Sequence, residues 1–307
     1  MQISTTPWRR FAGRPLGFLI AITLVSSWIV CCSDTGAPAT PARTDRPDNR
    51  PAEIWQGRSF AFTFTSDDGN ADNLAWTDVY REFGLRYTLF ITARWVGRPG
   101  KLTVQDLRRL QSDGFEIGGH SLSHPRLTDC SDSARIYEMV VCRDTLEVMI
   151  DSKDYRCLTF AYPENAHNDR VMATAGLFYT AARDGGTHPN GQPNFSEGRA
   201  EWDSCSLYEV PVAVTMSNLT GRNSFSEEKT RGAIRSRLAD YRKRHCWVVV
   251  ATHKLVDCDA DHMRWILEEL RAAADVWIAP FSEVAACYRR KIGLPPYSIS
   301  VTPRRPD

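Results

Sequence analysis

The sequence lacks an excess of charge of either sign, since 38 Lys and Arg residues stand against 37 Asp and Glu residues, for a net charge of +1. Nucleic acid binds through many unbalanced basic groups, so we do not expect it as a partner. The chain also shows no internal repeat and no C-x-x-C pair, which argues against a structural zinc site. Of its 307 residues, 42% are hydrophobic, which is enough to fill a sizeable core.

The N-terminal apolar run, residues 16–30, is shorter than the roughly 20 residues of a membrane-spanning helix. Three arginines precede it, which is the pattern of an export signal. Cys31 and Cys32 follow it and resemble a bacterial lipoprotein cleavage site, with Cys32 as the lipidated residue. We therefore expect residues 1–32 to be an export signal, and lipidation and plain secretion both remain open.

Composition divides the rest of the chain. Residues 33–53 are rich in Pro, Ala and Thr and nearly free of large apolar side chains, so they are predicted to be a linker. Residues 54–292 form the predicted catalytic domain, and residues 293–307 a C-terminal tail. We expect an exported protein of the cell envelope or medium, in contact with a membrane only through a lipid anchor. The sequence predicts no protein partner.

Seven cysteines follow the leader, and in an exported protein some of them should form disulfide bonds. They are Cys130, Cys142, Cys157, Cys205, Cys246, Cys258 and Cys287. Because seven is odd, at least one stays unpaired within the chain.

Short apolar segments alternate with amphipathic segments from residue 58 to residue 290, in seven or eight strand-to-helix steps. This alternation is typical of a mainly parallel sheet, either closed as a barrel or open with helices on both faces. In both arrangements functional groups gather where the strands end.

Polar residues follow four of the predicted strands. They are Asp67 and Asp68 in "FTFTSDDG", His120 and His124 in "GGHSLSHPRL", Tyr162 and Pro163 in "FAYP", and His253 after "VVVAT". A single histidine at a strand end is usually a hydrogen-bonded structural residue, but four strand ends converging on one place favour a site.

Two histidines four residues apart and one carboxylate make an open metal site. Zinc held by three protein ligands keeps a position for water and lowers the pKa of that water to about 7. One acid of the Asp67–Asp68 pair would complete the ligand set, and its neighbour would accept the proton of the water. The positive charge of the metal would offset the repulsion between the two acids.

The order of "TSDDG", "EIGGHSLSH", "FAYP" and a histidine after an apolar strand resembles the polysaccharide deacetylases of carbohydrate esterase family 4, which carry the NodB-like homology domain. The closing "DVWIAPFSEVAACYRR" is also similar to the end of that domain, and the resemblance covers roughly residues 60–288. It implies a distorted (β/α) barrel of about seven strands, with the active site at the C-terminal ends of the strands.

The resemblance also implies roles for single residues. Asp68, His120 and His124 would hold a divalent metal, usually zinc. Asp67 would be the general base and His253 the general acid. The metal and a backbone N–H would stabilise the oxyanion, and acetate would leave from the acetylated amine.

One motif departs from the family pattern. Ala161 and Glu164 stand where the third motif often has an arginine and an aromatic residue. That arginine normally orients the base, so either Arg183 replaces it or the base is held less tightly. We assign Tyr162, Pro163, Glu164 and Arg183 to substrate binding or to the oxyanion site.

The favoured function is therefore metal-dependent removal of acetyl groups, N-acetyl before O-acetyl, from a carbohydrate. The alternatives are hydrolysis of a non-sugar amide on the same scaffold and an inactive glycan-binding protein. Other histidines are expected on the surface or in loops: His167, His188, His245 and His262. Five tryptophans are expected mainly in the core, with a sugar groove as the alternative: Trp55, Trp76, Trp95, Trp202 and Trp277.

Overall fold

The computed structural model describes residues 55–187 and 205–295, and the predicted leader and linker lie outside these ranges. Within them, nine strands form one sheet in which every pairing is parallel. The strands are β1 Phe60–Ser66, β2 Thr88–Ile91, β3 Glu116–Gly119, β4 Thr159–Ala161, β5 Ala181–Thr187, β6 Val210–Val212, β7 Val214–Thr215, β8 Trp247–Thr252 and β9 Val276–Ile278.

The sheet follows the order β6-β5-β4-β3-β2-β1-β8-β7, and its two ends are neighbours in sequence. Only Ala213 separates β6 from β7, and its N–H donates to the carbonyl of Val249 on β8 at 2.8 Å. The path therefore returns on itself as a nearly closed barrel, which confirms the predicted fold class.

The strand count exceeds the predicted seven for two physical reasons. One barrel strand is divided at Ala213, so it counts as both β6 and β7. In addition, β9 pairs with the first half of β1, at Phe60–Phe62, where β2 does not reach because it pairs only at Thr65 and Ser66.

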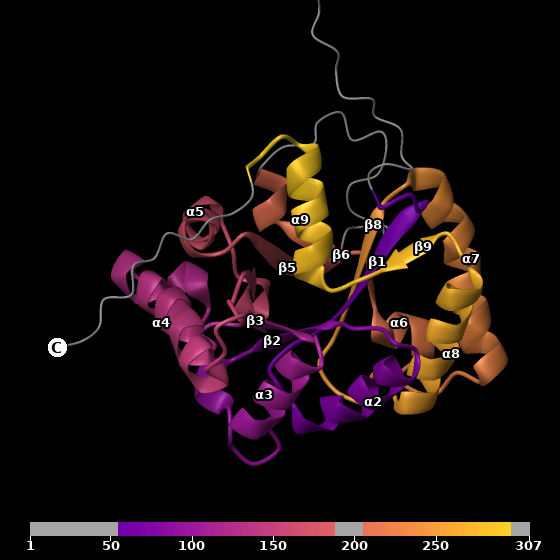
Figure 1. The fold of residues 1–307 in the computed structure, drawn as a ribbon, viewed down its shortest axis with the longest axis horizontal. Coiled ribbons are helices and arrows are strands. Elements are labelled where there is room, and N and C mark those ends of the chain that lie inside the picture. The colour runs from indigo at the N-terminus through magenta and orange to yellow at the C-terminus, as the bar shows by residue number, and fades with distance from the viewer. Residues whose placement is uncertain (1–54, 188–204, 296–307) are drawn as a thin grey trace, which may run out of the picture. The chain divides into compact units, whose positions relative to one another are not determined.

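Helices surround the sheet, as Figure 1 shows for α2, α3, α4, α7 and α8. The helices are α2 Leu74–Glu82, α3 Val104–Ser112, α4 Asp132–Ile150, α5 Asp169–Phe178, α6 Met216–Thr220, α7 Glu227–Arg244, α8 Ala260–Ala272 and α9 Phe281–Lys291. Short 3-10 turns lie at Ala71–Asn73, Ala93–Trp95, Leu127–Asp129, Pro163–Asn165 and Cys205–Tyr208. Among the residues that the structure describes, every helix is too short or too polar to span a bilayer.

Several helices begin where the sequence supplies a cap. Thr103 forms a capping box with Asp106, and Ser131 and Ser226 each accept a hydrogen bond from a backbone N–H of the first turn. These caps fix where α3, α4 and α7 begin, and so fix the lengths of the loops that precede them.

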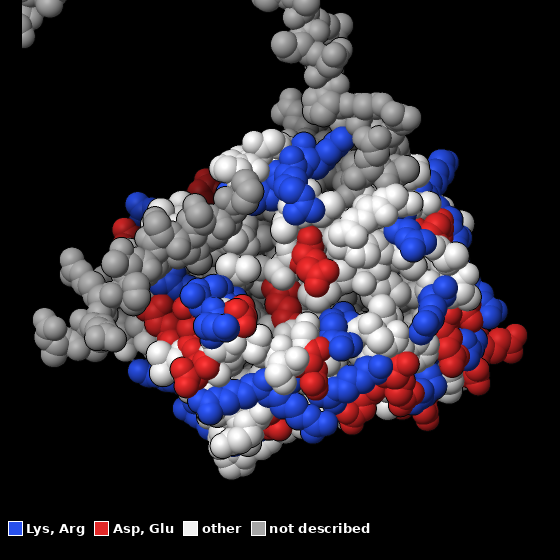
Figure 2. Space-filling view, viewed as in Figure 1, with Lys and Arg blue, Asp and Glu red and all other residues white. Residues whose placement is uncertain are grey.

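One helix, α9, closes the end of the barrel where the strands begin, and it crosses the centre of Figure 1. Its side chains Phe281 and Val284 share a buried cluster with inward-facing residues of the barrel, including Phe90 and Trp247. The N–H of Phe281 donates to Thr88 Oγ1 at 2.8 Å. Side chains of α9 therefore fill this end of the barrel. On the face that Figure 2 shows, basic and acidic side chains are interspersed.

The disulfide prediction is wrong for five cysteines of the described chain. Cys130, Cys142, Cys157, Cys246 and Cys258 are free thiols, and all but Cys130 are buried in the hydrophobic core. A buried thiol acts as a small apolar side chain, and burial raises its pKa, as it raises the pKa of Cys142 to about 12. Such thiols are unreactive packing residues.

Burial tests the expectations for two tryptophans and for His262. Trp55 and Trp76 are fully buried, as core packing predicts. His262 was expected on the surface or in a loop, but it is buried in α8 with Nδ1 2.8 Å from Asp259, the residue that caps the helix. Trp202 and His188 lie outside the described residues.

Candidate active site

Parallel pairing of β1 with β8 brings the first acid beside the last histidine. Ser66 pairs with Thr252, and the N–H of Asp67 donates to the carbonyl of Thr252 at 3.1 Å. Each strand then continues by one residue, which leaves His253 Nε2 3.7 Å from Asp67 Oδ2. The Asp67 side chain is buried, whereas that of His253 is 56% exposed, so the histidine lies on the solvent side of the acid.

The next two residues turn sharply. Asp68 and Gly69 have left-handed backbones, with φ of 73° and 67°. Aspartate tolerates this conformation better than most residues, and glycine adopts it without strain. A Cβ on Gly69 would also lie 3.0 Å from Ile91 Cδ1. The "DDG" sequence therefore aims two successive carboxylates in different directions.

The carboxylate of Asp68 faces two histidines from the loop after β3. Asp68 Oδ1 lies 3.7 Å from His120 Nε2 and 3.6 Å from His124 Nε2. One potential ligand atom from each of the three residues lies within 4.8 Å of the others. The structure thus brings together the three residues that the sequence predicted as metal ligands.

Hydrogen bonds fix the orientation of this loop. His120 Nδ1 donates to the carbonyl of Ala161 at 2.9 Å, which leaves Nε2 as the nitrogen with the lone pair. The N–H of His124 donates to Ser121 Oγ at 2.8 Å. Glu138, on α4, accepts hydrogen bonds from both the N–H and the hydroxyl of Ser123. The sequence analysis missed Glu138, because nothing in its local pattern links it to the histidine loop.

The three residues fit a divalent metal on two independent grounds. Asp68 Oδ1 is buried and has no hydrogen-bond partner among the described residues, and an unpaired carboxylate oxygen suits a cation. Burial lowers the pKa of His120 to about 4, against the opposing effect of Asp67. His120 is therefore neutral at pH 7, as a metal ligand must be.

Asp67 is held by Arg183, which extends from β5 across the barrel. Arg183 Nη2 donates to Asp67 Oδ2, and both side chains are almost fully buried. Burial alone would raise the pKa of Asp67, but the positive charge of Arg183, with smaller effects of His120 and His253, holds it below its usual value. Asp67 is therefore an ionised carboxylate at neutral pH.

Sheet register explains how an arginine reaches this place from β5. Ala161 on β4 is the direct neighbour of Arg183 in the ladder, and both are buried. The position that the family pattern gives to arginine thus holds only a methyl group, while the guanidinium approaches from the adjacent strand. Of the two options left open by the sequence, the geometry supports the first, in which Arg183 takes the place of the missing arginine.

Two further residues beside the cluster were not predicted as site residues. The Trp95 ring stacks on His124, with centroids 5.0 Å apart and an interplanar angle of 22°. Lys101 Nζ lies 4.4 Å from the centre of the Trp95 ring and 3.8 Å from Asp68 Oδ2, and it donates to Asn70 Oδ1 at 2.8 Å. Trp95 was considered for a sugar groove, but Lys101 is distant in sequence from every motif.

The remaining candidates lie next to the cluster. Tyr162 is buried, and its hydroxyl donates to the carbonyl of Tyr208 at 2.8 Å, so its side chain stabilises the fold. Pro163 is buried as well, whereas Glu164 is exposed and pairs with Arg126 at 3.1 Å. Among these three residues, Glu164 alone is exposed.

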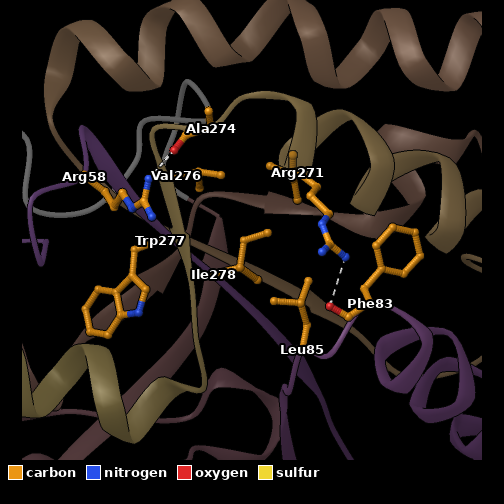
Figure 3. A pocket seen from close by; sticks show the side chains of 9 residues that line it. Arg58, Phe83, Leu85, Arg271, Ala274, Val276, Trp277 and Ile278 are labelled. Carbon is orange, nitrogen blue, oxygen red and sulfur yellow. Dashed lines mark hydrogen bonds between the residues drawn. The ribbon is translucent and has the colours of Figure 1, made fainter.

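A pocket of about 510 Å³ lies elsewhere, at the opposite end of β1 and β9 (Figure 3). It is lined by apolar side chains of β9 and of the segment before β2, with Arg58 and Arg271 at its sides. Arg58 donates to the carbonyl of Ala274, and Arg271 to that of Phe83. Asp67 follows the far end of β1, so this pocket takes no part in the site.

Replacing His124 with alanine should remove one of three ligands and lower metal affinity by at least about 10-fold, the usual scale for losing part of a metal site. The domain should remain folded, because His124 lies in a loop at the barrel mouth. Metal content after dialysis, measured with circular dichroism on the same sample, tests this. Retention of a full equivalent of metal would contradict the ligand assignment.

The structure thus combines a nearly closed parallel barrel with an Asp–His–His cluster and a buried acid at one end. Residues 56–179 match the family model described as polysaccharide deacetylase. The resemblance predicted from the motifs is thereby confirmed over this segment.

Two curated relatives match part of the chain. A gellan lyase from Bacillus sp. is 25% identical over 167 residues, which are 54% of this chain and 6% of the relative. The protein YxkH of Bacillus subtilis (strain 168), whose name proposes a polysaccharide deacetylase, is 23% identical over 114 residues, or 36% of this chain and 39% of the relative. The chain thus spans well under half the length of both relatives.

Solved structures share the fold at low sequence identity. The family 4 carbohydrate esterase domain of a multidomain xylanase from the hindgut metagenome of Trinervitermes trinervoides is 16% identical with a TM-score of 0.52, over 77% of this chain and 93% of that one. A family 4 acetyl xylan esterase from Clostridium thermocellum, in complex with cobalt, is 14% identical with a TM-score of 0.50, over 76% and 93%. A family 4 pseudoenzyme from Bacillus anthracis is 13% identical with a TM-score of 0.51, over 74% and 66%.

Proposed function

We propose that this protein is an exported, divalent-metal-dependent deacetylase that hydrolyses acetyl groups, N-acetyl in preference to O-acetyl, on a carbohydrate. The observation that carries the proposal is the position of Asp67, buried between Arg183 and His253 beside the Asp68, His120 and His124 cluster. Binding of a glycan alone would not need an ionised acid in contact with both a guanidinium and an imidazole.

Each step of the proposed reaction is assigned to particular residues of the chain. Asp68, His120 and His124 would hold the metal, Zn²⁺ in this proposal, which supplies a Lewis acid and lowers the pKa of a bound water. Asp67 accepts the proton of the attacking water, because it is ionised and lies at the same mouth of the barrel. The backbone N–H of Glu164 stabilises the oxyanion. His253, exposed to solvent beside Asp67, gives a proton to the leaving amine, and acetate is released.

The first test is acetate release from the purified, metal-loaded domain on N-acetylated glycans, O-acetylated glycans and a simple non-sugar acetamide. We expect release from an N-acetylated glycan to exceed release from the other two. Preference for the acetamide would instead support a non-sugar amide hydrolase. Binding of glycans without release of acetate would support the inactive glycan-binding protein, an alternative favoured by Ala161 in the third motif and by the pseudoenzyme among the structural neighbours.

The export proposal rests on the leader, residues 1–32, and the linker, residues 33–53. The mature protein should begin at or near Cys32 and partition into membranes if that cysteine is acylated. Mass spectrometry of the N-terminus in the native host decides the matter. An intact Met1 on cytosolic protein would rule out export.

A further inference from the structure

The segment that follows β4, residues 163–167, is a turn with an unusual backbone, and we call it the β4 turn. Glu164 has φ 53° and ψ 22°, and Asn165 has φ 56°, so two successive non-glycine residues are left-handed. This conformation raises the free energy of a non-glycine residue, and it persists only where the surroundings stabilise it. The contacts of the β4 turn should therefore show what holds it.

Hydrogen bonds leave one amide of the turn available. The N–H groups of Asn165, Ala166 and His167 donate to carbonyls within or just before the turn, at 3.2, 3.0 and 3.1 Å. The N–H of Glu164 has no partner among the described residues. Ala161, two residues before the turn, accepts the hydrogen bond of His120. The available N–H thus follows closely on a residue that orients a metal ligand.

Asn165 is seated against a glycine of β5. A Cβ on Gly185 would lie 1.5 Å from Asn165 Oδ1 and 2.5 Å from its Cγ. The Asn165 side chain therefore occupies the volume that any other residue at 185 would fill. Gly185 does not have a positive φ, so the glycine is required here by space and not by backbone conformation.

His167 holds the other end of the turn. Its ring stacks on Tyr162, with centroids 5.2 Å apart and an interplanar angle of 19°, and its Nδ1 donates to the carbonyl of Asn165 at 3.0 Å. Its Nε2 lies 3.4 Å from Glu209 Oε1. Tyr162 is itself fixed by its bond to the carbonyl of Tyr208. His167 was expected on the surface or in a loop, and it lies in this turn, where it links the turn to Tyr162.

We propose that Asn165 and His167 are positioning residues that hold the Glu164 N–H in place as the oxyanion donor, with Gly185 providing the seat for Asn165. This inference rests on the proposed deacetylase function for its effect on rate. Its structural part, a β4 turn held against β5, can be measured without any substrate.

The experiment compares Gly185→Ala, Asn165→Gly and the double variant with the parent domain. Gly232→Ala is the matched control, because a Cβ there meets no atom within 4 Å, on the exposed side of α7. Amide hydrogen exchange of residues 160–170 is followed by mass spectrometry, and kcat, KM and metal content are measured on the same preparations.

Gly185→Ala should speed exchange in the β4 turn and lower kcat by at least about 10-fold, a smaller loss than that caused by removing an oxyanion donor outright. KM and metal content should not change. Asn165→Gly removes the clashing side chain, so adding Gly185→Ala to it should change kcat by less than about twofold. Gly232→Ala should match the parent.

Exchange and kcat at the parent level in Gly185→Ala would overturn the proposal, because the Asn165 side chain would then move aside freely. Independent, additive effects in the double variant would overturn it as well. Loss of metal in Gly185→Ala would show that the turn acts through His120 and not through an oxyanion donor. If the parent releases no acetate from any substrate, the proposed function fails, and the exchange data alone decide whether the turn is held as described.

Discussion

Asp67→Asn should lower the rate of acetate release by about 100-fold or more, the usual minimum for losing a general base. Asparagine is nearly isosteric and can still accept a hydrogen bond from Arg183, so the fold should persist. The Asp68, His120 and His124 cluster is untouched, and the protein should keep its metal. The measurement is kcat together with metal content on the same sample.

Asp68→Asn is the matched control, because the two acids are adjacent and differ only in what they face. It should lose metal, since Asp68 Oδ1 points to both histidines. The opposite pattern, with metal lost from Asp67→Asn and kept in Asp68→Asn, would reverse the two assignments.

Arg183→Met should both slow the reaction and destabilise the fold. It leaves the buried carboxylate of Asp67 without its counter-charge, a change that costs about 3–5 kcal/mol when one partner of a buried pair is removed. Chemical denaturation at pH 7 measures the loss of unfolding free energy. Parent-like stability and rate in this variant would show that Arg183 does not hold the base.

The same pair gives a dependence on pH with a definite sign. The folded-state pKa of Asp67 lies below its usual value, so the pairing stabilises the fold above the unfolded-state pKa of about 3.9. The contribution is lost as the pH falls through the folded-state pKa. The stability difference between the parent and Arg183→Met should therefore shrink as the pH falls below about 4.

The neighbouring position offers an exchange test of how the base is held. In Ala161→Arg a second guanidinium would crowd the buried Arg183, so the rate should fall. In Ala161→Arg combined with Arg183→Ala, the charge returns from the adjacent strand and should recover part of the rate lost in Arg183→Ala. No recovery would show that an arginine on β4 cannot replace Arg183 on β5 in holding Asp67.

The sequence predicted that Asp68, His120 and His124 lie together, because the three residues belong to short motifs and the resemblance distinguished Asp68 from Asp67. Asp68 is fixed by its own turn, and His120 and His124 share one loop. The alternation of strands and helices predicted a mainly parallel sheet but left open whether the sheet closes. The resemblance implied a barrel, and no local pattern shows that a single residue, Ala213, joins the two ends of the sheet between β6 and β7.

Contacts between distant segments account for what the sequence could not decide. Whether Arg183 reaches Asp67 depends on the β4–β5 register and on the small side chain of Ala161, which no local pattern reveals. Lys101 is likewise brought to Asp68 by an isolated bridge between Asn70 and Lys101. The free thiols were predicted wrongly because export was taken to imply disulfides, whereas burial in the core explains most of these cysteines.

The central claim is that deacetylation depends on a divalent metal held by Asp68, His120 and His124. The most direct test is to remove the metal with a chelator, assay acetate release from an N-acetylated glycan, and then add back one equivalent of Zn²⁺. We predict that the metal-free domain is inactive, that activity returns in proportion to bound zinc, and that His124→Ala does not recover. Release of acetate at the full rate by a sample shown to contain no metal would contradict the account.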